Sequence, residues 1–553
     1  MSSRIDYGPI QHIGTQAHDH ANYFHAEDDA ANAQSSFADL DAQMSRPSPQ
    51  SHADMQRSSV TSFMHPNIGQ IATENSNGDG RLIVVSNRVA LPKDTRAGGL
   101  ASALKGALAE RGGIWFGWSG QVSAEPRFDI QPDPVYPIKY ATLDLDRDDY
   151  EGYYAGFSNR VLWPLFHYRL HLLDFNRDTL AAYRRVSAKF ADKLAALVKP
   201  DDTIWVHDYH LIPLGAALRS RGVECRIGFF LHTPIAPPEL IASLPHHRDL
   251  MSSFSSYDLV GFQTQTDQRS FTQYCETELD GIVDHDGHVE VHGRHFRVGT
   301  FPISIDTAHL ETLGQRAATS TNARRLNESM EGRVMLIGVD RLDYSKGLPE
   351  RFLAYRRLIN EHPDLQRQIT LLQIAPTSRE DVPEYRDLRR KLENLAGSIN
   401  SEFAEPDWAP IRYVNKSYQQ ARLAGFYRAS RVGLVTPLRD GMNLVAKEYI
   451  AAQDPNDPGV LILSRFAGAA HELTEALLVN PFDEEQVVGA MQQALMMPLG
   501  ERKRRWQRMM EYLRKHDVNA WRNRFLDTLQ ACPHVSNDRS TGTANGIVRS
   551  GVA

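Results

Sequence analysis

The sequence predicts an α/β protein made of two doubly wound domains that face each other, followed by a helical stretch near the C-terminal end. Short apolar runs of strand length alternate with amphipathic runs of helix length, and this alternation pauses near residues 305–330 and then restarts. Strands that are apolar throughout are typical of a parallel sheet covered by helices on both faces. Polar clusters follow many of these strands directly, where ligands bind in such sheets.

The first doubly wound domain is predicted over residues 80–310. Its expected strands are 82–86 (LIVVS), 203–206 (TIWV), 227–231 (IGFFL) and 259–262. Its expected helices are 100–110 and 211–220. Because strands and helices alternate, we expect a mainly parallel sheet with Rossmann-like topology.

The second domain is predicted over residues 311–532 and repeats this pattern. Its expected strands are 334–339 (VMLIGV), 369–374, 432–435 and 460–463. Its expected helices are 348–361, 386–395 and 443–452, and residues 484–530 have an almost wholly helical pattern. A ligand site is therefore expected in the cleft between the two domains.

The two ends of the chain have a different composition. Residues 1–79 are rich in Ser, Ala, Asp, His, Gln and Asn and contain few large aliphatic side chains. Such a segment buries too little apolar surface to offset its chain entropy, so a disordered extension is predicted. Three of its histidines, His18, His20 and His25, are interpreted as part of a solvated tail rather than a metal tract. Residues 533–553 are rich in small polar residues and are predicted to be a flexible tail.

Composition narrows the class of protein. The chain has 553 residues with a formal charge of -7, which disfavours general binding to nucleic acid or to an anionic membrane. Its three cysteines, Cys225, Cys275 and Cys532, are far apart in sequence, which argues against a disulfide framework or a cysteine zinc site. No apolar run reaches the length of a membrane span, and a cytoplasmic location is predicted.

Arg341 and Lys346 share the short loop RLDYSK that follows strand 334–339. Two cations held by a rigid strand suit a diphosphate, since Arg offers a fork of donors and Lys a point charge. From these residues alone, a surface loop with ion pairs to Asp340 or Asp343 is an equally good interpretation.

The segment Arg439–Asn443 (RDGMN) opens the helix predicted over 443–452. The backbone N–H groups and the dipole at a helix start favour a phosphate, and Gly441 permits close approach. Glu448 lies about one and a half turns further on, within reach of the ribose hydroxyls of a nucleotide bound there. The alternative for Glu448 is an ion pair with Lys447.

A second anion site is indicated by Arg88, Arg379 and the Gly98-Gly99 pair. Tyr154 and Trp163 offer flat faces with polar tips for a sugar, although plain core packing is the alternative for both. Asp208, His232 and Asp440 also follow predicted strands and are expected between the two anion sites, which lie on opposite sides of the cleft. This arrangement indicates transfer of a group between two phosphorylated ligands.

Several other chemistries are disfavoured by the sequence. No G-x-G-x-x-G or Walker A loop follows a predicted strand, and His471-Glu472 is not followed by a second His at the metalloprotease spacing. His207 and His210 are three residues apart, yet no third ligand is evident. We therefore expect neither a metal ion nor another cofactor.

The chain from about Arg81 to about Ala531 closely resembles the trehalose-6-phosphate synthases of retaining glycosyltransferase family 20. The resemblance rests on ten segments in matching order: VVSNRVALP, GGLASALKG, WFGWSG, FSNRVLWPLFHYR, IWVHDYHLIPL, RIGFFLHTP, DLVGFQT, VDRLDYSKGLPERFLAY, IAPTSREDV and VTPLRDGMNLVAKEYIAAQ. It implies a GT-B type fold, in which the first domain holds glucose 6-phosphate and the second holds UDP-glucose.

The same resemblance implies roles for single residues. The implied acceptor site consists of Arg88, Tyr154, Trp163, Asp208 and Arg379. The implied donor site consists of Gly98, Gly99, His232, Arg341, Lys346, Asp440, Gly441, Met442, Asn443, Leu444, Val445 and Glu448. The implied catalytic set consists of Arg341, Lys346, Asp208, His232 and Asp440.

The implied reaction moves glucose from UDP-glucose to glucose 6-phosphate with retention of configuration, giving α,α-trehalose 6-phosphate and UDP. A sister activity on the same scaffold, glucosylglycerol-phosphate synthesis from ADP-glucose and glycerol 3-phosphate, stays open, as does a non-catalytic sensor of sugar phosphates. The resemblance also implies a homo-oligomer, with a tetramer among the options. Nucleotide preference and the role of residues 1–79 are left open by the sequence.

Overall fold

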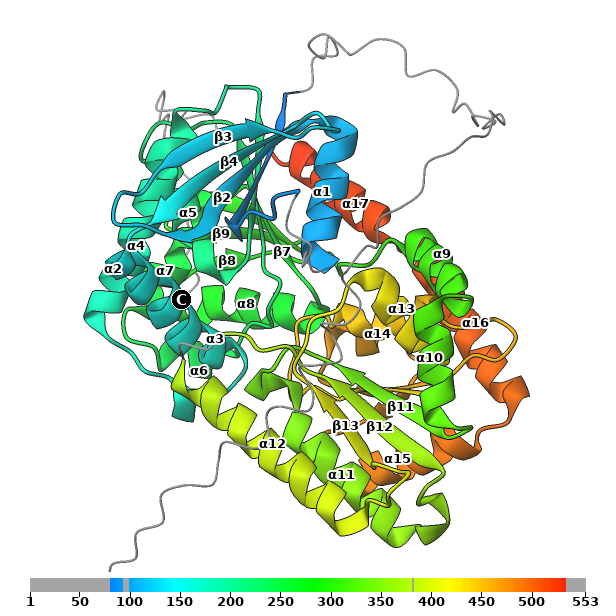
Figure 1. Cartoon of the computed structure of the whole chain (residues 1–553). Coiled ribbons are helices and arrows are strands. Elements are labelled where there is room, and N and C mark those ends of the chain that lie inside the picture. The colour runs from blue at the N-terminus through cyan, green and yellow to red at the C-terminus, as the bar shows by residue number, and fades with distance from the viewer. Residues whose placement is uncertain (1–79, 93–98, 380–381, 534–553) are drawn as a thin grey trace, which may run out of the picture. The chain divides into compact units, whose positions relative to one another are not determined.

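The computed structural model describes residues 80–92, 99–379 and 382–533 (Figure 1). The predictions made for residues 1–79, for Gly98 and for residues 534–553 concern positions outside these ranges. The predicted α/β class is confirmed. The chain forms two separate sheets with mainly parallel strands, and helices alternate with these strands along the sequence.

The first sheet has ten strands in the order β3-β4-β2-β1-β5-β6-β7-β10-β9-β8. Their bounds are β1 Leu82–Arg88, β2 Gly113–Val122, β3 Phe128–Pro132, β4 Ile138–Leu145, β5 Thr203–His207, β6 Arg226–Phe230, β7 Leu259–Phe262, β8 Ile282–Val283, β9 His288–Val291 and β10 Arg294–Thr300. The six central pairings, from β4 through to β10, are parallel, and the outer pairs are antiparallel. The strand order reverses between β1 and β5, so a ligand site is expected beyond their carboxyl ends.

The second sheet has six strands, all parallel, in the order β13-β12-β11-β14-β15-β16. Their bounds are β11 Val334–Val339, β12 Ile369–Ile374, β13 Ile411–Val414, β14 Val432–Val435, β15 Val460–Ser464 and β16 Leu477–Val479. Here the order reverses between β11 and β14. The loop with Arg341 and Lys346 follows β11 and the Arg439–Asn443 segment follows β14, so the two predicted phosphate-binding loops lie side by side at the switch point.

Helices of the first half include one unusual segment. The regular α-helices are α1 Gly99–Arg111, α4 Arg177–Ala195, α5 Leu214–Arg219, α6 Pro238–Ala242, α7 His247–Ser252 and α8 Gln265–Glu278. Between β4 and α4 the chain forms α2 (Arg147–Asp149), the π-helix η2 (Tyr150–Leu162) and α3 (Trp163–Phe166). π-Helical turns occur often at functional sites, and this one carries Tyr154 and ends at Trp163.

The predicted helix 211–220 is shorter than expected. A 3-10 turn, η4 (Tyr209–Leu211), comes first, and α5 begins only after Pro213. Pro213 has no N–H to donate to a helical hydrogen bond, and α5 starts at the residue after it.

Helices of the second half are α9 Thr307–Ala318, α10 Thr321–Met330, α11 Leu348–Glu361, α12 Pro383–Phe403, α13 Gln420–Ala429, α14 Leu444–Ala451, α15 Glu484–Met496, α16 Leu499–Lys515 and α17 Val518–Ala531. The last of them, α17, packs against the first sheet. Helix α17 packs on β6, β7 and α1, and the rings of Phe525 and Trp205 stack at 4.8 Å. The C-terminal helix therefore closes over the first sheet.

The cysteines and the helices bear on two further expectations. Cys225, Cys275 and Cys532 are all free and buried. Within the described ranges, none of the helices combines the length and the apolar character that crossing a membrane requires.

Candidate active site

A cavity of about 230 Å³ lies where loops after strands of both sheets meet. It is lined by Asn87, Tyr154, Trp163, His167, Asp208, Tyr209, His210, His232, Thr233, Arg341, Arg379 and Asp440. Seven of these were predicted from the sequence, four from the first domain and three from the second. These seven residues, predicted for the acceptor and the donor sites, are therefore brought together at one place.

The carboxylate of Asp343 is the common partner of several groups around this cavity. It is fully buried and accepts hydrogen bonds from Trp163 Nε1 at 3.4 Å, from Arg379 Nη1 at 3.3 Å and from Tyr385 Oη at 3.2 Å. Burial alone would raise the pKa of this carboxyl, but Arg379 and Arg341 lower it to about 2. Asp343 is therefore ionised at neutral pH and holds side chains from both halves of the chain.

Arg379 is fixed on three sides. Its guanidinium carbon lies 3.9 Å from the centre of the Trp163 ring, and its Nη2 donates to Tyr209 Oη at 3.1 Å. Its Nη1 also donates to Tyr385 Oη. These contacts use the Nη1 donors and one Nη2 donor, and they leave Nε–H and the second Nη2–H for a two-pronged contact with a phosphate.

Arg341 is held more loosely than Arg379. Its guanidinium lies 5.4 Å from the centre of the Trp163 ring, and its side chain is half exposed. The ion pair with Asp343 that was the alternative interpretation is present only at 4.0 Å. Most of the donors of Arg341 therefore stay available to a ligand.

Lys346 forms a buried ion pair with Asp440. Its Nζ lies 2.5 Å from Asp440 Oδ2, and Asn443 Nδ2 donates to the same oxygen at 2.9 Å. Burial raises the pKa of Asp440, but the Lys346 ammonium overcomes this and lowers it. The carboxylate that lines the cavity is thus ionised, and the ammonium stands directly behind it.

His232 presents a neutral ring to the cavity. Burial lowers its pKa to about 3 and also lowers the pKa of His207, and a hydrogen bond of 3.0 Å joins His232 Nε2 to His207 Nδ1. Its backbone N–H donates to Asp208 Oδ1 at 3.3 Å. Burial raises the pKa of Asp208 to about 6, and this residue has left-handed backbone with φ of 77°.

Gly441 marks the closest approach of the two halves. A Cβ atom built on Gly441 would lie 2.0 Å from the carbonyl oxygen of His232. Only glycine fits there, because any side chain would push the donor loop away from the first sheet. The close approach predicted for Gly441 is therefore made, in this structure, to His232.

Glu448 is buried in α14, and the alternative ion pair with Lys447 is not what the structure shows. Tyr427 Oη donates to Glu448 Oε2 at 3.4 Å, and burial raises the pKa of Glu448 to about 7. Lys447 instead pairs with Glu472 at 2.6 Å and donates to the carbonyl of Ile303 at 2.7 Å.

Some predicted residues do not line the cavity. Arg88 is exposed at the end of β1, and its guanidinium lies over Gly120. Gly99 begins α1, Met442 is buried, Asn443 precedes α14, and Leu444 and Val445 form its first turn. Lys346, Gly441 and Glu448 stand behind the lining residues.

Five lining residues were not predicted as site residues: Asn87, His167, Tyr209, His210 and Thr233. Four of them belong to polar clusters that directly follow β1, β5 and β6, so the same rule that selected Asp208 and His232 could have selected them. His167 follows α3 and carries no comparable signal. His207 is hydrogen-bonded to His232, and the ring of His210 stacks on that of Tyr154. Among the residues with described positions, no group of three or more His, Cys, Asp or Glu side chains could hold a metal ion.

The glycosyltransferase family 20 model matches residues 80–531. The chain belongs to this family. A trehalose-6-phosphate synthase from Sinorhizobium fredii is 50% identical over 468 residues, which cover 83% of this chain and 99% of that protein. A UDP-forming α,α-trehalose-phosphate synthase from Burkholderia xenovorans, solved in complex with glucose 6-phosphate, is 46% identical, covers 82% of this chain and all (100%) of its own, and superposes with a TM-score of 0.79.

A second similar structure, from E. coli, is bound with UDP-2-fluoro glucose. It is 45% identical, covers 82% of this chain and 99% of its own, and gives a TM-score of 0.78. The predicted two-domain GT-B type fold with closing helices is confirmed by these structural similarities and by the two sheets described above.

The buried Glu448 generates a prediction about pH. Its folded-state pKa of about 7 lies above the ordinary value of 4.5, so the folded form binds the proton more tightly than the unfolded form. The stability that this gives is complete below pH 4.5 and is lost as the pH rises through 7, by about 3 kcal/mol in the ligand-free protein. We expect Glu448→Gln to remove this slope in urea unfolding at pH 5, 6, 7 and 8.

The matched control is Glu361→Gln, which removes an exposed carboxyl at the end of α11. It should keep the wild-type slope. A Glu448→Gln protein that loses stability with pH as steeply as wild type would show that the buried carboxyl is not the titrating group.

Proposed function

We propose that this protein transfers glucose from UDP-glucose to glucose 6-phosphate with retention of configuration, forming α,α-trehalose 6-phosphate and UDP. One observation carries the proposal: the guanidinium groups of Arg341 and Arg379 both lie against Trp163 and Asp343 in one cavity. Two phosphorylated ligands can therefore be held side by side. The names and bound ligands of the related proteins support the same reaction.

On the acceptor side, we propose that Arg379 binds the phosphate of glucose 6-phosphate. Tyr154 and Trp163 give the sugar two flat faces, and Asp208 accepts from its hydroxyl groups. Arg88 is proposed as a second contact to that phosphate, as the family resemblance implies.

On the donor side, we propose that Arg341 and Lys346 neutralise the diphosphate of UDP-glucose. Asp440 and the backbone from Gly441 to Val445 hold the donor glucose, and Glu448 binds the ribose. The Gly98-Gly99 pair is proposed to contact the donor as well. The neutral ring of His232 offers the transferred glucose a hydrogen-bond partner without adding charge.

The proposed chemistry is substitution on one face of the donor sugar. The bond between C1 and the diphosphate oxygen breaks, O1 of glucose 6-phosphate attacks C1 from the same side, and the leaving diphosphate takes the acceptor proton. Negative charge grows on the leaving group in the transition state, so cations there act mainly on kcat. Arg341 and Lys346 supply that charge.

The substrate held by each domain and the location of the protein in the cell are also proposals. Residues 80–310 are proposed to hold the acceptor and residues 311–532 the donor. We place the protein in the cytoplasm, where its three buried free cysteines stay reduced. A homo-oligomer, with a tetramer as one form, is proposed from the family resemblance, and light scattering that finds a monomer at micromolar concentration would contradict it.

Arg341→Ala should lower kcat by roughly 10²–10³-fold, the usual cost of removing one donor to a developing oxyanion. The KM for UDP-glucose should change much less, because the contact strengthens in the transition state. Steady-state rates of UDP release measure both values. Arg316→Ala, an exposed arginine on α9, is the control and should behave as wild type. An Arg341→Ala protein with normal kcat would overturn the leaving-group role.

The reaction itself is tested by identifying the product. Incubation with UDP-glucose and glucose 6-phosphate should give trehalose 6-phosphate, while ADP- and GDP-glucose arms establish the nucleotide preference. A parallel arm with glycerol 3-phosphate tests the sister activity. Glucosylglycerol phosphate as the main product, or ligand binding without turnover, would replace the proposed function.

A further inference from the structure

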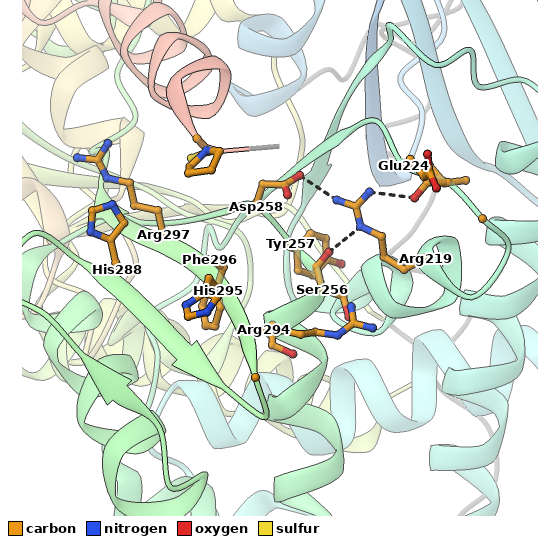
Figure 2. A pocket seen from close by; sticks show the side chains of 16 residues that line it. Arg219, Glu224, Ser256, Tyr257, Asp258, His288, Arg294, His295, Phe296 and Arg297 are labelled. Carbon is orange, nitrogen blue, oxygen red and sulfur yellow. Dashed lines mark hydrogen bonds and ion pairs between the residues drawn. The ribbon is translucent and has the colours of Figure 1, made fainter. Parts of the chain in front are cut away.

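A second and larger cavity, of about 660 Å³, lies away from the candidate active site. It is formed by residues just before β6 and β7, by the β9–β10 hairpin and by the chain after α17, at Cys532 and Pro533 (Figure 2). The active-site residues Asp208 and His232 instead follow the carboxyl ends of β5 and β6. The two cavities therefore lie at opposite ends of the strands of the first sheet. Along the five-residue strand β6, these ends are about 17 Å apart.

Two arginines on β10 give this cavity unbalanced positive charge. Arg294 and Arg297 both line it, and neither side chain takes part in a hydrogen bond or ion pair with any residue of the described ranges. Arg297 is half-buried, and His288 is directly opposite it in the β9–β10 ladder. Arg294 is exposed, so the donors of both side chains are available to an anion in the cavity.

The remaining charged groups of the lining do not neutralise these arginines. Arg219, the third lining arginine, is committed to Asp258 at 2.9 Å and to the carbonyl oxygens of Ser256, Val223 and Cys225. Asp258 is thereby occupied, and it also accepts from the N–H of Ile227 at 2.7 Å. Glu224 is exposed and is the one other acidic side chain in the described lining.

The lining also offers an apolar surface for the body of a ligand. Tyr257 and Phe296 are buried aromatic side chains of the lining, and Val223 and Pro533 add aliphatic contacts. The volume falls in the range of small-molecule sites. Residues 534–553 do not complement the charge, since they contain Arg539 and Arg549 against a single acidic side chain, Asp538. The lining therefore matches an anion that carries an organic body.

We propose that this cavity is a second binding site, which takes an organic phosphate of sugar-phosphate size. Arg294 and Arg297 bind the phosphate through their forked donors, and the apolar part of the lining at Val223, Phe296 and Pro533 contacts the sugar or an equivalent group. The site lies too far from Asp208 and His232 for its ligand to take part in transfer. It is a ligand site separate from both proposed substrate sites.

Equilibrium dialysis with radiolabelled glucose 6-phosphate tests the proposal by counting the ligand bound per chain. The double variant Arg294→Gln/Arg297→Gln should bind one equivalent fewer than wild type, with unchanged kcat, because both substitutions lie outside the active site. Inorganic phosphate should displace that equivalent only at concentrations at least about tenfold higher, since it lacks an organic body to contact the apolar part of the lining.

The matched control is Arg316→Gln/Arg324→Gln, which removes two exposed arginines from α9 and α10 and the same net charge. It should bind as many equivalents as wild type. The proposal is overturned if the Arg294→Gln/Arg297→Gln protein binds as much glucose 6-phosphate as wild type, or if both double variants lose it equally. Equal displacement by inorganic phosphate would overturn the assignment to an organic ligand. Because binding is counted apart from turnover, failure here leaves the proposed reaction untouched.

Discussion

The arrangement of the active site depends on one buried carboxylate, that of Asp343. Taking a carboxylate out of water costs several kcal/mol unless cations and hydrogen bonds compensate it. Here Arg379, Tyr385 and Trp163 provide that compensation, and Arg341 stands at 4.0 Å. The same contacts place the proposed acceptor cation and the proposed donor cation around one indole ring.

Two further contacts also join the second half of the chain to the first. The backbone at Gly441 meets the carbonyl of His232, and the buried Lys447 donates to the carbonyl of Ile303. These contacts leave the ionised Asp440 and the neutral His232 in the same cavity before any ligand binds. Groups fixed in advance need little reorganisation when charge develops, which is the condition for strong electrostatic catalysis.

Much of this could be predicted from local sequence patterns. The strands β7, β11, β12 and β14 have the predicted bounds, because each is a wholly or mainly apolar run in a buried parallel sheet. Asp208, His232 and Asp440 were predicted because ligands in such sheets bind beyond the carboxyl ends of strands, and all three line the cavity. These signals are local, so one sequence is enough to detect them.

The parts that were not predicted depend on distant contacts or weak patterns. Strands β2 and β9 mix glycine or charged residues with apolar ones, and the π-helix η2 has no 3.6-residue period to detect. The sequence marked Asp343 only as a partner for Arg341, whereas its bond to Trp163 joins residues 180 positions apart. The placement of α17 on the first sheet is likewise a tertiary contact that its own sequence does not encode.

The dependence of the active site on the Asp343 carboxylate is tested most directly by the steady-state kinetics of Asp343→Asn. This substitution keeps the shape of the side chain and removes its charge. We expect the KM for glucose 6-phosphate to rise about tenfold or more and kcat to fall as well, because Arg379 and Arg341 lose their common anchor. Asp387→Asn, on the exposed face of α12, is the control and should match wild type. An Asp343→Asn protein with wild-type kcat and KM values would contradict the account.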